Sequence, residues 1–189
     1  FDERADLDGL KRITAAVHQH HVPILAQLSH AGSAAHKALT GQEPLGPSAV
    51  LNPARTASAY GQPELPRPMG EKDLVRVRDA FAAAALRARE AGYDGVEIHA
   101  AHGYLLNQFY SPLTNKRTDA YTGSTLEGRT RYLREVIQAV RAAVPADFAV
   151  TLRLGGGDYM EGGSRPEELP QAVDCLLYTS DAADERSSV

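Results

Sequence analysis

The chain has 189 residues, 43% of them hydrophobic and 23% charged, which is enough apolar material to bury the core of one globular domain. This composition excludes a collagen-like or disordered chain, and no stretch approaches the ~18 consecutive apolar residues of a membrane span. The formal net charge of -4 argues against a surface that binds a nucleic acid or an anionic membrane.

The first predicted elements are a helix and a buried strand. Apolar residues recur at helical spacing over residues 5–20, and Pro23 ends this helix because the residue before a proline avoids the helical region. Residues 23–28 form a short apolar run that is typical of a strand in a parallel sheet. Prolines and glycines punctuate residues 32–70, which predicts a long loop.

The order of helix, strand and loop then returns. Residues 72–91 predict a helix with an Ala-rich middle, and Gly92 stands where a C-terminal cap is expected. A strand with β-branched residues is expected over residues 94–99, and a second long, polar loop over residues 103–125.

The clearest helical pattern covers residues 129–144 and stops at Pro145. A third strand is expected over residues 148–154, where a triplet of glycines ends it. Alternation of strands and helices predicts an α/β fold with parallel strands and right-handed crossovers. Both long loops follow the carboxyl ends of strands, and parallel-sheet enzymes build their active sites at that end.

Polar side chains stand at these three strand ends. Gln27 lies at the end of the first strand, His99, His102 and Tyr104 follow the second, and Arg153 comes late in the third. An unpaired buried guanidinium is costly, so Arg153 is expected to meet a partner.

Spacing alone leaves several interpretations of these residues open. His99 and His102 suit a capped turn, an anion or carbonyl site, or a metal site, although they lack the HExxH spacing and a marked third ligand. Tyr104 alone is more often a core aromatic than an acid, and Gln27 alone is more often a satisfied buried amide than a ligand. The glycines at 155–157 are weak evidence for a phosphate cradle.

Longer motifs resemble one family. PILAQLSHAG at residues 23–32 resembles the third strand of the NADH:flavin oxidoreductase, or old yellow enzyme, family. DGVEIHAAHGYLLNQF at residues 94–109 resembles the fourth strand and catalytic turn of that family, and SPLTNKRTD at residues 111–119 continues the match. The resemblance covers about residues 1–174.

The resemblance implies an FMN-containing (β/α)8 TIM barrel that reduces activated C=C bonds of α,β-unsaturated carbonyl compounds with NADH or NADPH. About three of the eight strand–helix units are identifiable here, so residues 1–174 are expected to form a partial FMN-binding barrel. The first two strands would precede Phe1, and the last three, with the flavin-phosphate loops, would follow the end. The isolated piece is therefore expected to bind FMN weakly and to be inactive by itself.

The resemblance also implies a role for each of the five polar residues. Gln27 would bind the pyrimidine edge of the flavin, and Arg153 would stabilise negative charge on the reduced ring. His99 and His102 would hold the substrate carbonyl oxygen, where negative charge develops. Tyr104 would give a proton to the α-carbon, opposite the hydride from flavin N5. No metal is expected at the site.

Residues 175–189 depart from the family pattern. A helix begins near Glu167, but from Cys175 the sequence CLLYTSDAADE resembles the conceptual translation of a transposon-type sequencing adaptor. The native register is therefore expected to end at Asp174, and removal of residues 175–189 is expected not to lower stability.

Other functions stay open from the sequence. One is an amine dehydrogenase or demethylase of the same extended flavin family, and another is a metal-dependent barrel hydrolase that uses His99 and His102. A third is an inactive piece, because three strands cannot close a barrel. The expected partner is a small unsaturated carbonyl compound, with no nucleic acid and no membrane, and the full-length parent could be a homo-oligomer. One cysteine and the absence of an opening signal peptide favour the cytoplasm.

Overall fold

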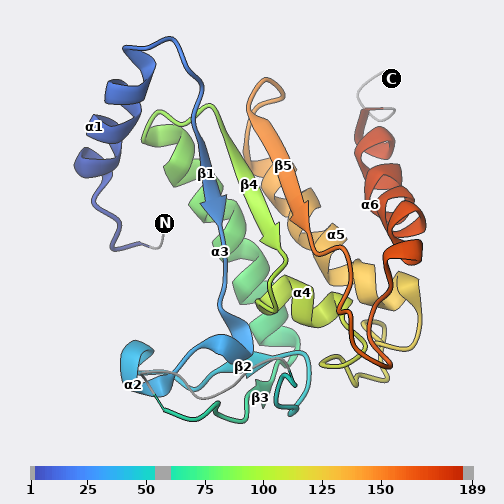
Figure 1. The fold of residues 1–189 in the computed structure, drawn as a ribbon. Helices are drawn as coiled ribbons and strands as arrows, with labels where there is room; N and C mark the ends of the chain where they lie inside the picture. Colours follow the sequence, from blue (N-terminus) through green and yellow to red (C-terminus); the bar gives the residue numbers. More distant parts are fainter. Residues whose placement is uncertain (1–2, 54–60, 185–189) are drawn as a thin grey trace.

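A three-stranded parallel sheet forms the centre of the fold (Figure 1). In the computed structural model, which describes residues 3–53 and 61–184, the strands are β1 (Leu25–Leu28), β4 (Gly95–Ala100) and β5 (Ala149–Leu154). Their order is β1-β4-β5, and both pairs are parallel. The three strands and the α/β class predicted from the sequence are thus confirmed, with strand starts shifted by one or two residues.

Long helices pack against one face of this sheet. They are α3 (Glu71–Glu90) and α5 (Leu126–Ala143), which lie behind the strands in Figure 1 and contact each other along their length. α1 (Leu7–His18) precedes β1, and α6 (Leu169–Asp184), entered through the 3-10 turn η2 (Pro166–Glu168), packs on α5. None of the described helices combines the length and the hydropathy that a membrane-spanning helix requires.

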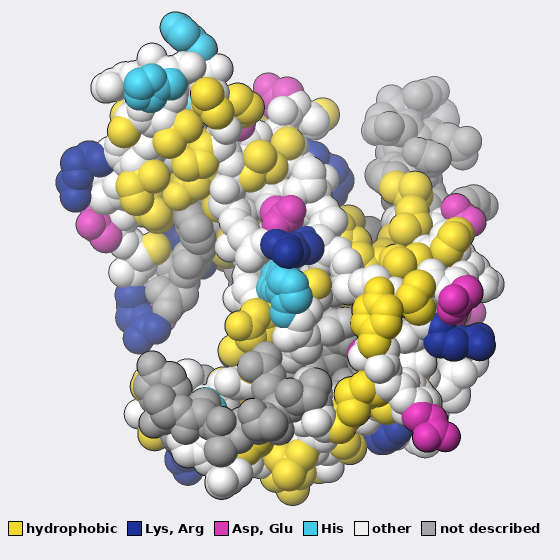
Figure 2. Space-filling model, in the orientation of Figure 1, with side chains coloured by type: hydrophobic (Ala, Val, Ile, Leu, Met, Phe, Trp, Pro, Cys, Tyr) yellow, Lys and Arg dark blue, Asp and Glu magenta, His cyan; other side chains and the backbone are white. Residues whose placement is uncertain are grey.

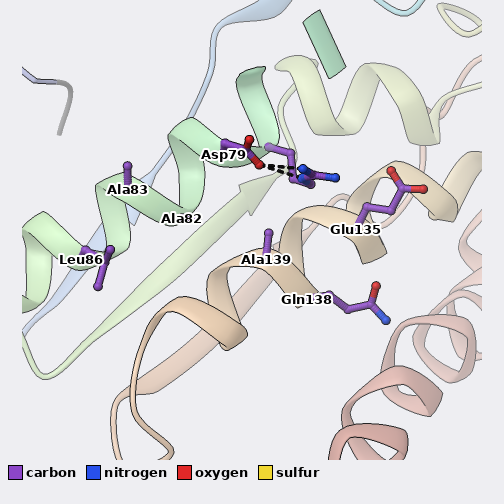
Figure 3. A pocket seen from close by; sticks show the side chains of 8 residues that line it. Asp79, Ala82, Ala83, Leu86, Glu135, Gln138 and Ala139 are labelled. Carbon is purple, nitrogen blue, oxygen red and sulfur yellow. Dashed lines mark hydrogen bonds and ion pairs between the residues drawn. The ribbon is translucent and has the colours of Figure 1, made fainter. Parts of the chain in front are cut away.

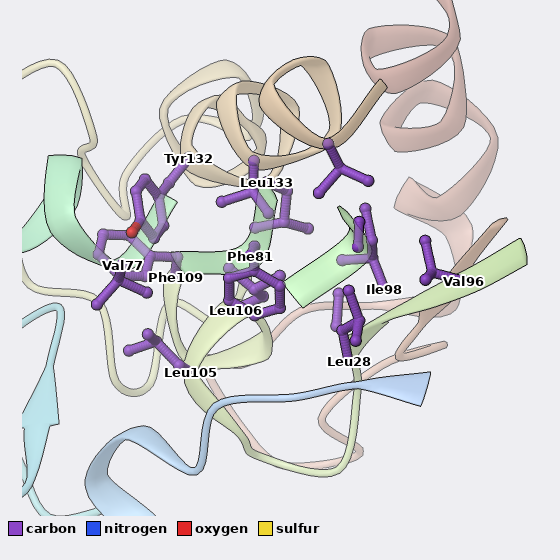
Figure 4. Packing of buried hydrophobic residues seen from close by; sticks show 14 of the residues in the cluster. Leu28, Val77, Phe81, Val96, Ile98, Leu105, Leu106, Phe109, Tyr132 and Leu133 are labelled. Atoms are coloured by element: carbon purple, nitrogen blue, oxygen red, sulfur yellow. The ribbon is translucent and has the colours of Figure 1, made fainter. Parts of the chain in front are cut away.

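The hydrophobic core fills the space between the sheet and these helices (Figure 4). Val96 and Ile98 of β4 are fully buried and belong to the same core cluster as Val77 and Phe81 of α3 and Leu133 of α5. Each such side chain stabilises the fold by roughly 1.5–3 kcal/mol relative to its exposed state. Tyr132 is buried with them, and its hydroxyl donates to the carbonyl of Leu74 at 3.0 Å. The polar atom that enters the core thus keeps a partner.

The predicted loop over residues 32–70 contains short elements that the sequence did not indicate. They are η1 (Gly32–Ala34), α2 (Lys37–Thr40), β2 (Leu45–Gly46) and β3 (Arg67–Pro68), the last two forming a separate parallel pair. Elements of two to four residues are too short to show a hydrophobic period. Residues 54–60 of this loop lie outside the described residues.

The prediction of a second, polar loop over residues 103–125 was wrong for the first part of this range. Leu105–Tyr110 form helix α4, and all six of its residues are buried, including Asn107 and Gln108. A helix that is buried on every side has no polar face, so its sequence shows no amphipathic period. The amides made the segment look like a loop.

The helix that was expected to break at Cys175 continues to Asp184 as α6. Leu176, one residue past the expected break, is only 7% exposed and belongs to the hydrophobic core, whereas Leu177 is 58% exposed. The side chains beyond residue 177 are not described. The division into a barrel at residues 1–174 and a non-native tail at 175–189 stays a prediction, and the burial of Leu176 gives a way to test it.

Replacing Leu176 by alanine should lower the free energy of unfolding by about 2 kcal/mol, the lower end of the cost of truncating a buried leucine. Leu177→Ala is the matched control at an exposed position and should change it by less than about 0.5 kcal/mol. Urea unfolding measures both. Equal stabilities of the two variants would mean that Leu176 contributes no core packing, as expected of a non-native tail.

Candidate active site

The sheet face opposite the core helices carries the candidate site. Side chains alternate along a strand, so one face of β1 buries Ala26 and Leu28 while the other exposes Gln27. The strand register then arranges this second face in three rows that change from small or apolar to polar to basic. From the amino ends of the strands, the rows are Leu25, Gly95 and Ala149, then Gln27, Glu97 and Thr151, and last His99 and Arg153. Figure 2 shows acidic, basic and histidine side chains together over the middle of this face.

A tight turn after β4 brings the three predicted catalytic side chains together. His102 and Gly103 both adopt the left-handed conformation, with φ of 58° and 70°. A non-glycine residue there is strained, and such strain persists where the surrounding structure holds the residue. The turn places the His102 ring 5.0 Å from the His99 ring and the Tyr104 ring 5.4 Å from it, measured between centroids.

Two buried amides that the sequence analysis did not single out hold this turn. Asn107 Oδ1 accepts a hydrogen bond from the backbone N–H of Gly103 at 2.7 Å. Gln108, only 1% exposed, donates from Nε2 to the Gly103 carbonyl at 2.7 Å and accepts at Oε1 from the Ser33 backbone N–H at 3.0 Å. Gln108 therefore ties the loop after β1 to the turn after β4. The only signal in the sequence was the pair of adjacent amides inside an otherwise apolar stretch.

The surroundings of His99 favour the neutral form of its imidazole ring. Its side chain is 3% exposed, and burial lowers its pKa, with further lowering by the charges of His102 and Arg153 and a smaller opposing effect of Glu97. Its Nδ1 atom is buried and has no hydrogen-bond partner among the described residues. A buried ring nitrogen without a partner costs free energy, which a polar ligand at this position would recover.

A cleft of about 630 Å³ opens at the carboxyl ends of β4 and β5. His102, Tyr104 and Arg153 line it, together with Asn107 and the glycines at 155–157. Gln27 does not line the cleft, because it lies one row closer to the amino ends of the strands. Its Nε2 atom donates to Glu97 Oε1 at 2.6 Å. The structure thus gathers four of the five predicted site residues at one end of the sheet and leaves Gln27 deeper on the same face.

Asp158 holds the wall of the cleft that follows β5, and the sequence analysis missed it. Its Oδ2 atom accepts from Ser111 Oγ at 2.7 Å, from the Ser164 backbone N–H at 2.7 Å and from Ser164 Oγ at 3.0 Å. Ser111 and Ser164 are both buried, so these bonds link the loop after β5 firmly to the end of α4.

A second hollow of about 600 Å³ lies between α3 and α5, and none of the predicted site residues lines it (Figure 3). Small side chains such as Ala82, Ala83 and Ala139 form its floor, and the Arg78–Asp79 ion pair of 2.8 Å stands at its edge. Among the described residues, no group of three His, Cys, Asp or Glu side chains is placed to hold a metal ion. His99 and His102 therefore gain no third ligand in this part of the chain.

Comparison with known proteins gives one consistent result. A family model described as the NADH:flavin oxidoreductase / NADH oxidase family matches residues 1–185. A metal reductase of Desulforamulus reducens is 44% identical over 162 residues, which are 86% of this chain and 23% of that protein. An NADPH dehydrogenase of Clostridium acetobutylicum is 38% identical over 178 residues, which are 94% of this chain and 50% of that protein.

Solved structures agree with the fold. The old yellow enzyme homologue from Zymomonas mobilis matches with a TM-score of 0.83 and 32% identity, over 94% of this chain and 51% of that one. A 2-naphthoyl-CoA reductase in complex with 2-naphthoyl-CoA matches with a TM-score of 0.83 and 30% identity, over 94% of this chain and 28% of that one. The predicted partial TIM barrel is thus confirmed, and the chain spans between about a quarter and a half of the length of these relatives.

The histidines at this end of the sheet make stability depend on pH. Burial lowers the pKa of both His30 and His99, with added repulsion from Arg76 at His30, so the unfolded chain binds more protons than the folded chain below the ordinary value of 6.5. The contribution of these two histidines to the free energy of unfolding should therefore be fully present above pH 6.5. The free energy of unfolding should fall as the pH is lowered from 6.5 towards 5. Urea unfolding across this range measures it.

In the same series, His30→Gln should flatten the dependence, and replacement of the exposed His20 by glutamine should leave it unchanged. A wild-type free energy of unfolding that rises as the pH is lowered to 5 would contradict the direction given for these two pKa values.

Proposed function

The chain belongs to the NADH:flavin oxidoreductase / NADH oxidase family, and we propose that it forms the substrate-activating part of an enzyme that reduces C=C bonds conjugated to a carbonyl group. The observation that carries this proposal is that His102 and Tyr104 line one cleft and that the ring of the buried His99 lies next to both of theirs. Because the chain spans at most about half the length of these relatives, the activity proposed is that of the whole enzyme.

FMN is the cofactor of the family, and the donors on the open sheet face fit it. Gln27 offers an exposed amide, and Arg153 offers an exposed guanidinium in the next row. An amide suits the alternating donors and acceptors of a pyrimidine edge, and a fixed positive charge favours negative charge on the ring. When bound, FMN supplies to the substrate the hydride that it receives from NADH or NADPH.

We assign His99 and His102 to the carbonyl oxygen of the substrate. As a hydride adds to the β-carbon, negative charge develops on that oxygen, and preorganised N–H donors stabilise it. Burial of His99 and the nearby charges of His102 and Arg153 keep its ring neutral, so it can donate a proton into a hydrogen bond without losing it. The unpartnered Nδ1 atom supports a polar ligand beside this ring.

Tyr104 is assigned as the proton donor to the α-carbon. It lies at the start of α4, in the lining of the cleft, and its position depends on the hydrogen bonds that Asn107 and Gln108 make to Gly103. A hydroxyl held near the two imidazoles can reach the carbon next to the carbonyl that they bind.

Two substrate classes fit this chemistry. One is a simple enone, as expected for an ene-reductase, and the other is an unsaturated acyl-CoA thioester. The second is favoured by the likeness to a solved 2-naphthoyl-CoA reductase, whose title names its complex with 2-naphthoyl-CoA. The alternative is that the intact enzyme is an amine dehydrogenase or demethylase of the same extended flavin family, because amine oxidation would also use the flavin. A homo-oligomeric parent enzyme stays a prediction.

Tyr104→Phe should slow reduction of an enone such as cyclohexenone by the intact enzyme, because the variant lacks the proton for the α-carbon. Reduction of the flavin by NADH or NADPH should be largely unaffected. Stopped-flow flavin absorbance times the two half-reactions separately. Tyr93→Phe, at the amino end of β4, is the matched control and should leave both rates unchanged. An unaltered oxidative half-reaction in Tyr104→Phe would remove Tyr104 from this role.

His102→Ala should weaken phenol binding and raise the barrier of enone reduction by about 3 kcal/mol, as expected when one donor to a developing oxyanion is lost. Phenols report on the oxygen site through the flavin spectrum, so binding is measured without turnover. Replacement of the exposed His20 by alanine is the control. Unchanged phenol affinity in the His102 variant would argue that the oxygen binds elsewhere.

A further inference from the structure

Glu97 occupies an unusual place for a carboxylate. It lies in the middle row of the open sheet face, between Gln27 of β1 and Thr151 of β5. The neighbouring positions of the face are apolar on one side and basic on the other, so none of the three catalytic assignments explains an acid here. Its Oε1 atom accepts a short hydrogen bond of 2.6 Å from Gln27 Nε2.

The other neighbour in this row does not compete for Glu97. Thr151 has one hydroxyl proton, and its Oγ1 atom donates that proton to the backbone carbonyl of Val96 at 3.2 Å. Within this row, Gln27 is therefore the residue that donates a hydrogen bond to the Glu97 side chain. The short distance between nitrogen and oxygen is typical of a hydrogen bond to a charged acceptor, which is stronger than a neutral one.

A carboxylate imposes one orientation on a primary amide. The Gln27 side chain has a donor end and an acceptor end, and rotation by 180° exchanges them. An ionised carboxylate only accepts hydrogen bonds, so it attracts the NH₂ end and repels the carbonyl oxygen. With the NH₂ end bound to Glu97, the Oε1 atom and the second N–H of Gln27 remain available on its exposed side.

We propose that Glu97 is a positioning residue that holds the amide of Gln27 with its carbonyl oxygen available to the N3–H group of the flavin. This inference rests on the proposed function, because it takes Gln27 to bind the pyrimidine edge. That edge presents one N–H donor between two carbonyl acceptors. An oxygen acceptor beside an N–H donor matches it, whereas the reversed amide would set a donor against the flavin N–H.

The test is a double-mutant cycle on FMN affinity in the intact enzyme, using titration of the apoprotein with FMN. Glu97→Gln is nearly isosteric but can donate as well as accept, so it no longer selects one amide orientation. It should weaken FMN binding roughly tenfold, the effect of losing one hydrogen bond to a charged group. Gln27→Ala should weaken binding as well. In the Gln27→Ala background, Glu97→Gln should cause no further loss.

Two further variants separate position from charge and from folding. Glu97→Asp keeps the charge but is one methylene shorter, so it should lose the contact and weaken FMN binding like Glu97→Gln. Replacement of the exposed Glu90 at the end of α3 by glutamine is the matched control and should bind FMN as the wild type does. The flavin reduction potential is a second readout. It should become more positive in Glu97→Gln, where a negative charge is removed, and change less in Glu97→Asp.

The outcomes distinguish this inference from the proposed function. If Gln27→Ala leaves FMN affinity unchanged, Gln27 does not hold the flavin, and the proposed cofactor site and the inference both fail. If Gln27→Ala weakens binding but Glu97→Gln does not, the inference alone fails. A loss of equal size in both backgrounds also overturns it, because a merely structural role of Glu97 would not depend on the amide at residue 27.

Discussion

β4 fixes the rest of the structure, because both other strands of the sheet pair with it and no other strand among the described residues does. Its parallel register with β1 and β5 sets which side chains stand level, and the alternation along a strand sets which face they occupy. Val96 and Ile98 therefore enter the core while Glu97 and His99 face the other way. A shift of the register by one residue would exchange the two sets and remove both the core and the site.

The site depends on this sheet through a small number of buried polar contacts. His102 sits in a strained backbone conformation, which costs free energy of the order of 1–3 kcal/mol. Asn107 and Gln108 offset this cost by satisfying the backbone of Gly103, and both are inside the protein, where a lost hydrogen bond is expensive. Asp158 does the same for the loop after β5. Rigid support of this kind suits a site that must aim donors at one oxygen atom.

The helix layer and the open face carry different functions. α3 and α5 cover the apolar face and supply the core, while Gln27, Thr151 and Arg153 on the other face are exposed. In the described residues, β1 and β5 each pair on one side only, and the chain covers about half of the NADPH dehydrogenase and of the old yellow enzyme homologue that it resembles. The polar face in such a relative would turn inward to the centre of a barrel, where side chains from alternate strands form layers.

The three strands, the long helices, the α/β class and the residue types at the strand ends could be predicted from the sequence, because strong hydrophobic periods and glycine or proline breaks mark these elements. Its long motifs also pointed to the family. The sequence could not show α4, since its six residues are buried on every side and carry no period. Nor could it show that Gln27 bonds Glu97, or that Gln108, which is 75 residues from Ser33 in the chain, joins the loop after β1 to the turn after β4. Those partners are chosen by strand register and by the course of the turn after β4, which exist only once the sheet has formed.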